Sequence, residues 1–178
     1  ASRVIDSRLT IVCCPNAVVD GWATAIQGIF PDSDVLTKTW DPVWKDGSEY
    51  RYLVLNYEMF QLEVSSGNIK RFLESATPAF IVIDEIHFAK QASPNGMSHR
   101  REMVIALVTN STDANSNLYV LGMSATPVIN NLQEGRSMIE MMGKNKLWFV
   151  CAGAMLALAR DPAQWARVRA DRSLLPGI

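Results

Sequence analysis

Four short apolar segments, separated by stretches with helical spacing, constrain the fold of this chain more than any other feature. The segments are LTIVCC at residues 9–14, YLVLNY at 52–57, FIVID at 80–84 and LYVLGM at 118–123. Each is nearly all apolar without alternation, which is typical of parallel strands covered on both faces. The helical stretches are residues 18–30, 66–75 and 98–111, while residues 39–51 indicate a loop or a hairpin. Strands that alternate with helices predict right-handed βαβ units and an α/β fold.

The composition agrees with one domain that has a sizeable core. The chain has 178 residues, of which 48% are hydrophobic and 20% are charged, as is ordinary for globular proteins. A formal net charge of −1 gives no overall basic signal for nucleic acid, although a local basic face would suffice. The three cysteines, two of them adjacent (Cys13 and Cys14), indicate buried thiols in a reducing compartment, so we expect a cytoplasmic protein. No apolar run approaches about 18 residues, and we therefore expect no membrane span.

Polar residues follow the predicted strands at their carboxyl ends, where parallel α/β sheets place their binding sites. They are Pro15 and Asn16, Asn56 and Tyr57, Asp84 and Glu85, and Ser124 and Thr126. Asp84 could hold Mg²⁺ through water, because Mg²⁺ prefers hard oxygen ligands and keeps much of its hydration. Glu85 could orient and deprotonate a water molecule that attacks a γ-phosphate. A buried strand that simply ends in solvated acids explains the same two residues.

The segment LGMSATP, residues 121–127, places small hydroxyl side chains at a strand end, before a proline. Ser124 and Thr126 could form hydrogen bonds to the neighbouring acidic strand end and so respond to its state. Alternatively, the segment is a Ser-Thr-Pro turn that caps the next helix.

Together, these motifs resemble the first RecA-like domain of superfamily-two helicases, and most closely that of Swi/Snf-type DNA translocases. DEIH is similar to their acidic motif II, MSATPVINNLQE to motif III, IVCCPNAVVDGW to motif Ia and LVLNYEMF to motif Ib. The four motifs occur in the order of that family over about residues 9–142, and each alone is a weak or moderate signal. The resemblance implies a three-layer RecA-like α/β domain with a mostly parallel sheet, from an ATP-binding, DNA-binding hydrolase.

The resemblance also implies a role for each matching residue. Asp84 would hold Mg²⁺ through water, Glu85 would activate the attacking water, and His87 would couple the nucleotide site to motif III. Ser124 and Thr126 would link ATP hydrolysis to domain movement. The residues expected near a DNA backbone, through phosphate contacts without sequence readout, are Pro15, Asn16, Asn56 and Tyr57. A strand-end turn explains these four equally well, and the alternative for His87 is a satisfied histidine at a loop start.

One part of the family pattern is absent from the sequence. A phosphate loop, G-x-x-x-x-G-K-[ST], should precede motif Ia and cradle the β- and γ-phosphates. No glycine precedes Leu9, so this loop and its strand, normally central to the sheet, are missing, as is the second RecA-like domain with its arginine finger. We therefore expect a fragment or a rearranged domain with little or no ATPase activity alone and no tightly bound ATP or Mg²⁺. Residues 2–8 or 146–150 could fill the place of the missing strand, and unpaired sheet edges could allow a homodimer.

The C-terminal part differs in character, so we divide the chain into a partial motor domain, residues 1–145, and a helical tail of different origin, residues 146–178. Asp161, Pro162 and Gln164 mark a helix start in this tail. About residues 151–177 resemble a segment of the haem-thiolate monooxygenases of the cytochrome type. The loop with the haem-ligating cysteine is missing, so we expect no haem and interpret Cys151 as a buried thiol. The combination suggests a chimera, and the alternative to a motor fragment is a non-catalytic or engineered α/β domain with at most weak nucleic-acid or protein binding.

Overall fold

The computed structural model describes residues 1–89, 92–93, 96–124, 141 and 146–151. Its central feature is a sheet of six strands in which every neighbouring pair is parallel. In spatial order the strands are β2 (Asp34–Thr37), β3 (Arg51–Asn56), β1 (Leu9–Cys14), β4 (Phe80–Ile83), β7 (Tyr119–Ser124) and β8 (Lys146–Cys151). The chain therefore has the α/β fold that the sequence predicts.

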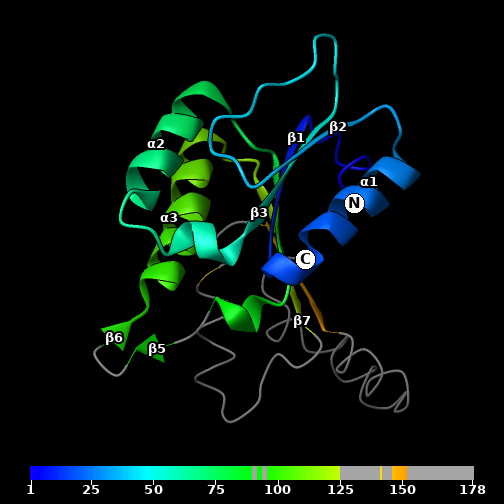
Figure 1. The fold of residues 1–178 in the computed structure, drawn as a ribbon. Helices are drawn as coiled ribbons and strands as arrows, with labels where there is room; N and C mark the ends of the chain where they lie inside the picture. The colour runs from blue at the N-terminus through cyan, green and yellow to red at the C-terminus, as the bar shows by residue number, and fades with distance from the viewer. Residues whose placement is uncertain (90–91, 94–95, 125–140, 142–145, 152–178) are drawn as a thin grey trace, which may run out of the picture.

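Helices cover both faces of this sheet (Figure 1). Helix α1 (Val19–Ile29) lies on one face, whereas α2 (Ser65–Ser75) and α3 (His99–Ala114) lie together on the other. Short elements complete the described part: the 3-10 turns η1 (Asn16–Val18), η2 (Tyr57–Phe60) and η3 (Ile86–Phe88), and a small antiparallel ladder of β5 (Ala92–Ser93) and β6 (Gly96–Met97). Among the described residues, no helix is long and apolar enough to cross a membrane.

Two hydrophobic cores, one on each face of the sheet, explain why the central strands are nearly all apolar without alternation. Successive strand residues point to opposite faces. Ile11 is buried against the α2 and α3 side, in a cluster with Phe72 and Leu107. Its neighbour Val12 is buried on the other side, in a cluster with Val19 from α1. A strand that must fill both cores cannot alternate between apolar and polar residues.

The connections of the sheet change direction between β1 and β4. From β1 the chain runs through α1 to β2, on one side of β1. From β4, which pairs with the other edge of β1, it runs through α3 to β7 and away from β1. Such a change of direction is the switch point at which doubly wound sheets bind their ligands, outside the carboxyl ends of the strands.

The sequence pattern did not predict the strand β2, and it left open whether the segment after β2 is a loop or a hairpin. Residues 38–50 link β2 to β3, which is parallel to it, so this segment is a crossover loop and no hairpin. Trp40 is buried in the core under α2, where its ring meets Phe60 edge-on, and Trp44 packs against the same core. The loop therefore covers the sheet where other crossovers use a helix.

The strand β8 changes the interpretation of residues 146–178. We expected a helical tail from residue 146, but Lys146–Cys151 forms a strand that pairs in parallel with β7 at the edge of the sheet. The sequence LWFV within it is rich in β-branched and aromatic residues, which favour strands. Of the two segments considered for an additional strand, residues 146–150 therefore provide it, while residues 2–8 form turns. The predicted helix start at Asp161, Pro162 and Gln164 lies outside the described residues.

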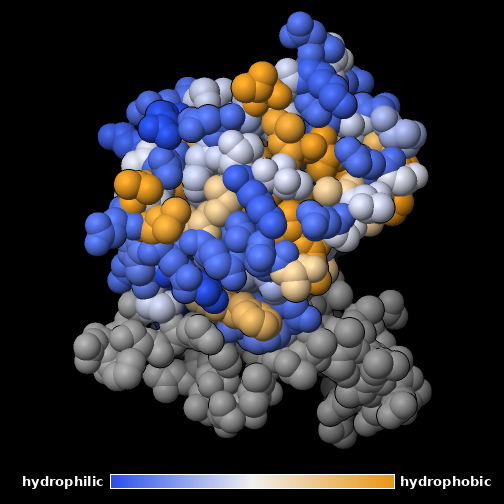
Figure 2. Space-filling view, in the orientation of Figure 1, coloured by the Kyte–Doolittle hydropathy of each residue, from blue (hydrophilic) through white to orange (hydrophobic). Residues whose placement is uncertain are grey.

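Hydrogen bonds and an ion pair hold the N-terminal residues against the amino-terminal side of the sheet. Ser2 shares a buried hydrogen bond with Tyr52, with 2.8 Å between the two hydroxyl oxygens. The guanidinium of Arg3 pairs with Asp32 at 2.7 Å and lies 3.5 Å from the ring centre of Tyr50. In the space-filling view, polar side chains cover most of the visible described surface and leave scattered apolar patches between them (Figure 2).

Candidate functional site

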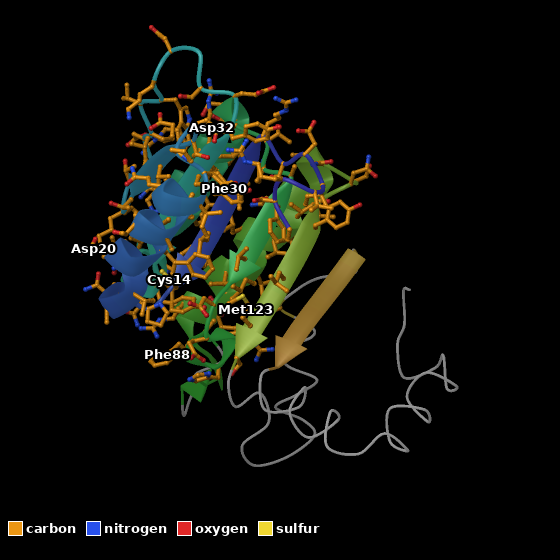
Figure 3. All side chains as sticks on the ribbon, turned by 90° about the vertical axis from the view of Figure 1, so that its right-hand side faces the viewer. Cys14, Asp20, Phe30, Asp32, Phe88 and Met123 are labelled. Atoms are coloured by element: carbon orange, nitrogen blue, oxygen red, sulfur yellow. The ribbon has the colours of Figure 1, made fainter. Side chains whose placement is uncertain are left out.

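The predicted acidic pair lies at the switch point of the sheet. Asp84 follows β4 directly, and its backbone N–H donates to the carbonyl of Cys13 at 2.8 Å, which extends the pairing of β4 with β1. Figure 3 shows Cys14, Met123 and Phe88 at this carboxyl end of the strands, with Asp32 at the opposite end. The carboxylates of Asp84 and Glu85 therefore belong to the edge where ligands of such sheets bind.

Two residues from other elements hold Asp84 in place. Trp22 of α1 donates its indole N–H to Oδ2 of Asp84, with 2.7 Å between the heavy atoms. Tyr57 of η2 donates its hydroxyl to the backbone carbonyl of Asp84 at 2.6 Å. In the described part of the chain, Oδ1 of Asp84 accepts no hydrogen bond. Trp22 and Tyr57 thus fix one carboxylate oxygen and the backbone carbonyl of Asp84.

Glu85 has an unusual backbone conformation. Its φ of 48° and ψ of 52° lie in the left-handed region, which residues other than glycine adopt uncommonly. This turn separates β4 from η3 and reverses the direction of the chain at the end of the strand. Oε2 of Glu85 is buried and has no hydrogen-bond partner among the described residues, although Nδ1 of His87 lies 3.2 Å away. Such strained residues cluster at functional sites.

His87 connects the ends of two neighbouring strands. Its Nδ1 lies 3.0 Å from Oγ of Ser124, the last residue of β7, within hydrogen-bonding distance. The same Nδ1 lies 3.2 Å from Oε2 of Glu85, so the imidazole lies between the acidic turn and Ser124. The ring packs on Phe88, with 4.7 Å between the ring centres. The structure therefore brings together Asp84, Glu85, His87 and Ser124, whereas Thr126 lies outside the described residues.

The residues expected near a DNA backbone lie at the same edge but differ in exposure. Pro15 is half-buried and Asn16 is exposed. Asn56 is buried and donates through Nδ2 to Asn16 at 3.3 Å and to Glu58 at 2.8 Å. Tyr57 is only 1% exposed, so its ring belongs to the core. Its hydroxyl donates a hydrogen bond to the backbone carbonyl of Asp84. Of these four residues, the surface exposure favours Asn16 most as a contact for an external ligand.

The electrostatic environment of this edge is acidic. The pKa of the Cys14 thiol is raised to about 12, first by burial and then by the nearby carboxylates of Asp84 and Glu58, while Lys38 opposes them. The pKa of Tyr57 is raised well above its ordinary value, first by burial and then by neighbours that include Asp84. Both shifts therefore report mainly that the two groups are shielded from water, with a smaller contribution from the Asp84 carboxylate.

The donor set fits a magnesium ion that keeps most of its water. Asp84 and Glu85 offer hard carboxylate oxygens, and Mg²⁺ is commonly held by one or two carboxylates together with waters and substrate phosphates. Among the residues that the structure describes, no group of three or more His, Cys, Asp or Glu could form a complete metal cage. Asp84 and Glu85 are thus two described residues at this edge whose oxygens could hold such an ion.

Sequence reasoning did not reveal the contacts of Trp22 with Asp84, of Glu58 with Asn56, or the proximity of Lys38 to Cys14. Trp22 stands in the helix after the first strand, and the segment IVCCPNAVVDGW already drew attention to it. Its partner Asp84 is 62 residues away, and no local pattern reveals a pairing at that separation. Glu58 directly follows the predicted pair Asn56 and Tyr57, and this position in the sequence was the one indication that Glu58 belongs to the same turn.

No protein-family model matches the chain, and no curated protein matches it either. The functional assignment therefore rests on the sequence motifs and on the geometry described above.

Proposed function

We propose that this chain is a fragment of an ATP-dependent DNA helicase or translocase motor, from its first RecA-like domain. The observation that carries the proposal is the contact of His87 with Ser124 at 3.0 Å, beside the carboxylates of Asp84 and Glu85. In such a motor, a histidine of the acidic motif and a hydroxyl residue of the next strand would couple the nucleotide site to domain movement.

In this proposal, Asp84 holds Mg²⁺ through water, and Mg²⁺ supplies charge neutralisation for the phosphates of ATP. The hydrogen bond from Trp22 orients the Asp84 carboxylate, with 2.7 Å between Nε1 and Oδ2. Fixing a ligand in advance lowers the entropy that binding has to offset. Glu85 accepts the proton of the attacking water, which is the role of a general base close to the reacting phosphate.

The same proposal limits what the chain does alone. The printed sequence contains no G-x-x-x-x-G-K-[ST] phosphate loop, so the amides and the lysine that cradle phosphates are lacking. We therefore propose weak Mg²⁺–ATP binding and little or no hydrolysis, with DNA contacts formed by Asn16 and its surroundings. We also propose that two copies of the chain form a homodimer through unpaired sheet edges.

The test is nucleotide binding by the whole chain. Energy transfer from tryptophan to a fluorescent ATP analogue measures the binding, once with Mg²⁺ and once with EDTA. We expect binding that depends on Mg²⁺ and that Asp84→Asn weakens by about tenfold, the effect of losing one strong interaction of a charged group. Asp113→Asn is the matched control, since Asp113 is exposed in α3. Glu85→Gln should keep the binding and lose any residual hydrolysis, with and without DNA.

Equal binding by the wild type, Asp84→Asn and Asp113→Asn would exclude the proposed role of Asp84. Binding that persists unchanged in EDTA would exclude Mg²⁺. Absence of any nucleotide binding would favour the alternative, a non-catalytic or engineered α/β domain with at most weak nucleic-acid or protein binding.

A further inference from the structure

A surface hollow at the amino-terminal edge of the sheet lies opposite the site described above. It lies where β1 and β3 begin, between the end of α2 and the loop of residues 38–50 (Figure 1). Leu9 and Arg51, the first residues of the two strands, line it together with Trp44 and Thr77. We infer that this hollow binds a small aromatic monocarboxylate, with Arg51 as its anion-binding group, and this inference does not depend on the proposed motor function.

The size and the walls of the hollow suit a small organic molecule. Its volume is about 530 Å³, within the usual range of roughly 300–1,000 Å³ for ligand pockets. Trp44, Pro42 and Ala76 form apolar parts of the wall. The indole of Trp44 offers a flat aromatic surface, on which a second aromatic ring can pack in an offset or edge-on arrangement. A few polar groups among apolar walls are what orients a ligand in such pockets.

Two arginines line the hollow, but only one of them has a charge that is not already balanced. Arg8 pairs with Glu49 and, at 3.2 Å, with Asp6. Arg51 forms no ion pair within the described part of the chain. Its guanidinium carbon lies 5.8 Å from the ring centre of Trp44, which places the cation beside the aromatic wall. The uncompensated positive charge of the hollow is therefore that of Arg51.

The Arg51 side chain also has an unsatisfied donor. Its Nε is buried and has no hydrogen-bond partner among the described residues. A buried donor without an acceptor is unfavourable, so the described residues leave the guanidinium of Arg51 incompletely satisfied. A guanidinium presents its N–H groups as a planar fork, and a carboxylate accepts from two of them at once. The chemistry of Arg51 thus favours a carboxylate.

The balance of charges favours a ligand with one negative charge over a nucleotide or another multiply charged phosphate. Glu49 lines the same hollow, and its carboxylate repels anions even though it is paired with Arg8. One uncompensated guanidinium neutralises one negative charge. The hydroxyls of Ser48 and Thr77, which also line the hollow, can donate to the outer side of a bound carboxylate.

Nuclear magnetic resonance of the ¹⁵N-labelled whole chain tests this inference, with sodium benzoate as the probe. We expect saturable shifts of the Arg51 Nε–H, the Trp44 indole N–H and the Thr77 amide, with a Kd of about 1 mM for so small a ligand. Benzyl alcohol, which has the same ring without the charge, should bind at least about tenfold more weakly. Inorganic phosphate, which lacks the aromatic body, should give no saturable shift at Trp44.

Arg51→Gln should weaken benzoate binding by about tenfold, and Arg51→Lys should weaken it too, because lysine keeps the charge but lacks the planar fork. The matched control is Arg71→Gln, which removes an exposed arginine paired with Asp41 outside the hollow. The amide spectrum without ligand verifies that each variant is folded. Benzoate shifts that do not saturate, or that are equal in Arg51→Gln and Arg71→Gln, would overturn the inference. Equal binding of phosphate and benzoate would overturn the requirement for an aromatic body.

Discussion

The indole of Trp22 donates a hydrogen bond to the carboxylate of Asp84, with 2.7 Å between Nε1 and Oδ2. This contact joins the first helix, α1, to the residue that ends β4, across the switch point of the sheet. Because the site depends on where the Asp84 carboxylate points, the packing of α1 on the sheet also determines the geometry of the site.

Replacing Trp22 with phenylalanine should lower the free energy of unfolding by about 1–2 kcal/mol, since a hydrogen bond to a carboxylate is lost in a half-buried position. Urea denaturation at neutral pH measures this difference. Because phenylalanine also packs less surface, Trp22→Phe, Asp84→Ala and the double variant form a cycle that isolates the hydrogen bond, since an asparagine in place of Asp84 would still accept from the indole. Strictly additive effects of the two substitutions would show that the indole and the carboxylate do not interact.

Replacing Tyr57 with phenylalanine should destabilise the protein by about 1–2 kcal/mol, because the buried carbonyl of Asp84 loses its donor at 2.6 Å. The control is Tyr50→Phe, which removes a hydroxyl that donates to Asp6 at 3.0 Å on the exposed surface. That variant should change stability by less than about 0.5 kcal/mol. Equal losses in the two variants would show that the Tyr57 hydroxyl has no special role in supporting Asp84.

The four central strands were predictable because nearly all of their residues are apolar, as burial on both faces of the sheet requires. The segment at residues 9–14 is buried at all six positions of β1, and its lack of alternation follows directly from that double burial. The helices after them were recognised by their spacing, with ends that differ from the predicted ones by at most three residues. The strand β2 was not predicted, because its sequence DVLT is short and half polar. In the described part of the sheet it is the first strand in the spatial order.

The residues of the candidate site were recognised by type, but not by contact. Strand-end position identified Asp84 and Ser124, because the ends of parallel strands meet at one edge of a sheet. The left-handed turn at Glu85 was not foreseeable, since no glycine or asparagine marks it. Nor was the contact of Tyr57 with Asp84, which the apolar segment at residues 52–57 does not indicate, although the ring of Tyr57 fills the core. Contacts between residues far apart in sequence follow from packing, which local patterns do not contain.

The backbone of Glu85 provides a third prediction. A left-handed conformation is unfavourable for a residue with a Cβ by about 1–2 kcal/mol, whereas glycine adopts it freely. Glu85→Gly should therefore be more stable than Glu85→Ala by about 1 kcal/mol, because both lose the carboxylate and only one loses the strain. Thermal denaturation of the two variants under identical conditions measures the difference. A more stable alanine variant would show that this turn is not strained in solution.

Stability at high pH tests the burial of Cys14. Its pKa is raised from the ordinary value of 9.0 to about 12, first by burial and then by Asp84 and Glu58. Below about pH 9 the thiol is neutral in both the folded and the unfolded chain, so the raised pKa has no effect on stability. Above pH 9 the unfolded thiol ionises and the folded one does not. The free energy of unfolding should then fall by about 1.4 kcal/mol per pH unit until the folded pKa is reached.

Urea denaturation of the wild type and of Cys14→Ala, at about pH 8 and about pH 10 with a reducing agent present, measures this contribution. Other groups titrate over the same range, but they do so in both proteins, so the difference between the two slopes belongs to Cys14. The wild type should lose about 1–2 kcal/mol more than the variant between the two pH values. Parallel losses would mean that the Cys14 thiol reaches solvent in the folded chain, and that the carboxyl end of β1 is more open than its complete burial indicates.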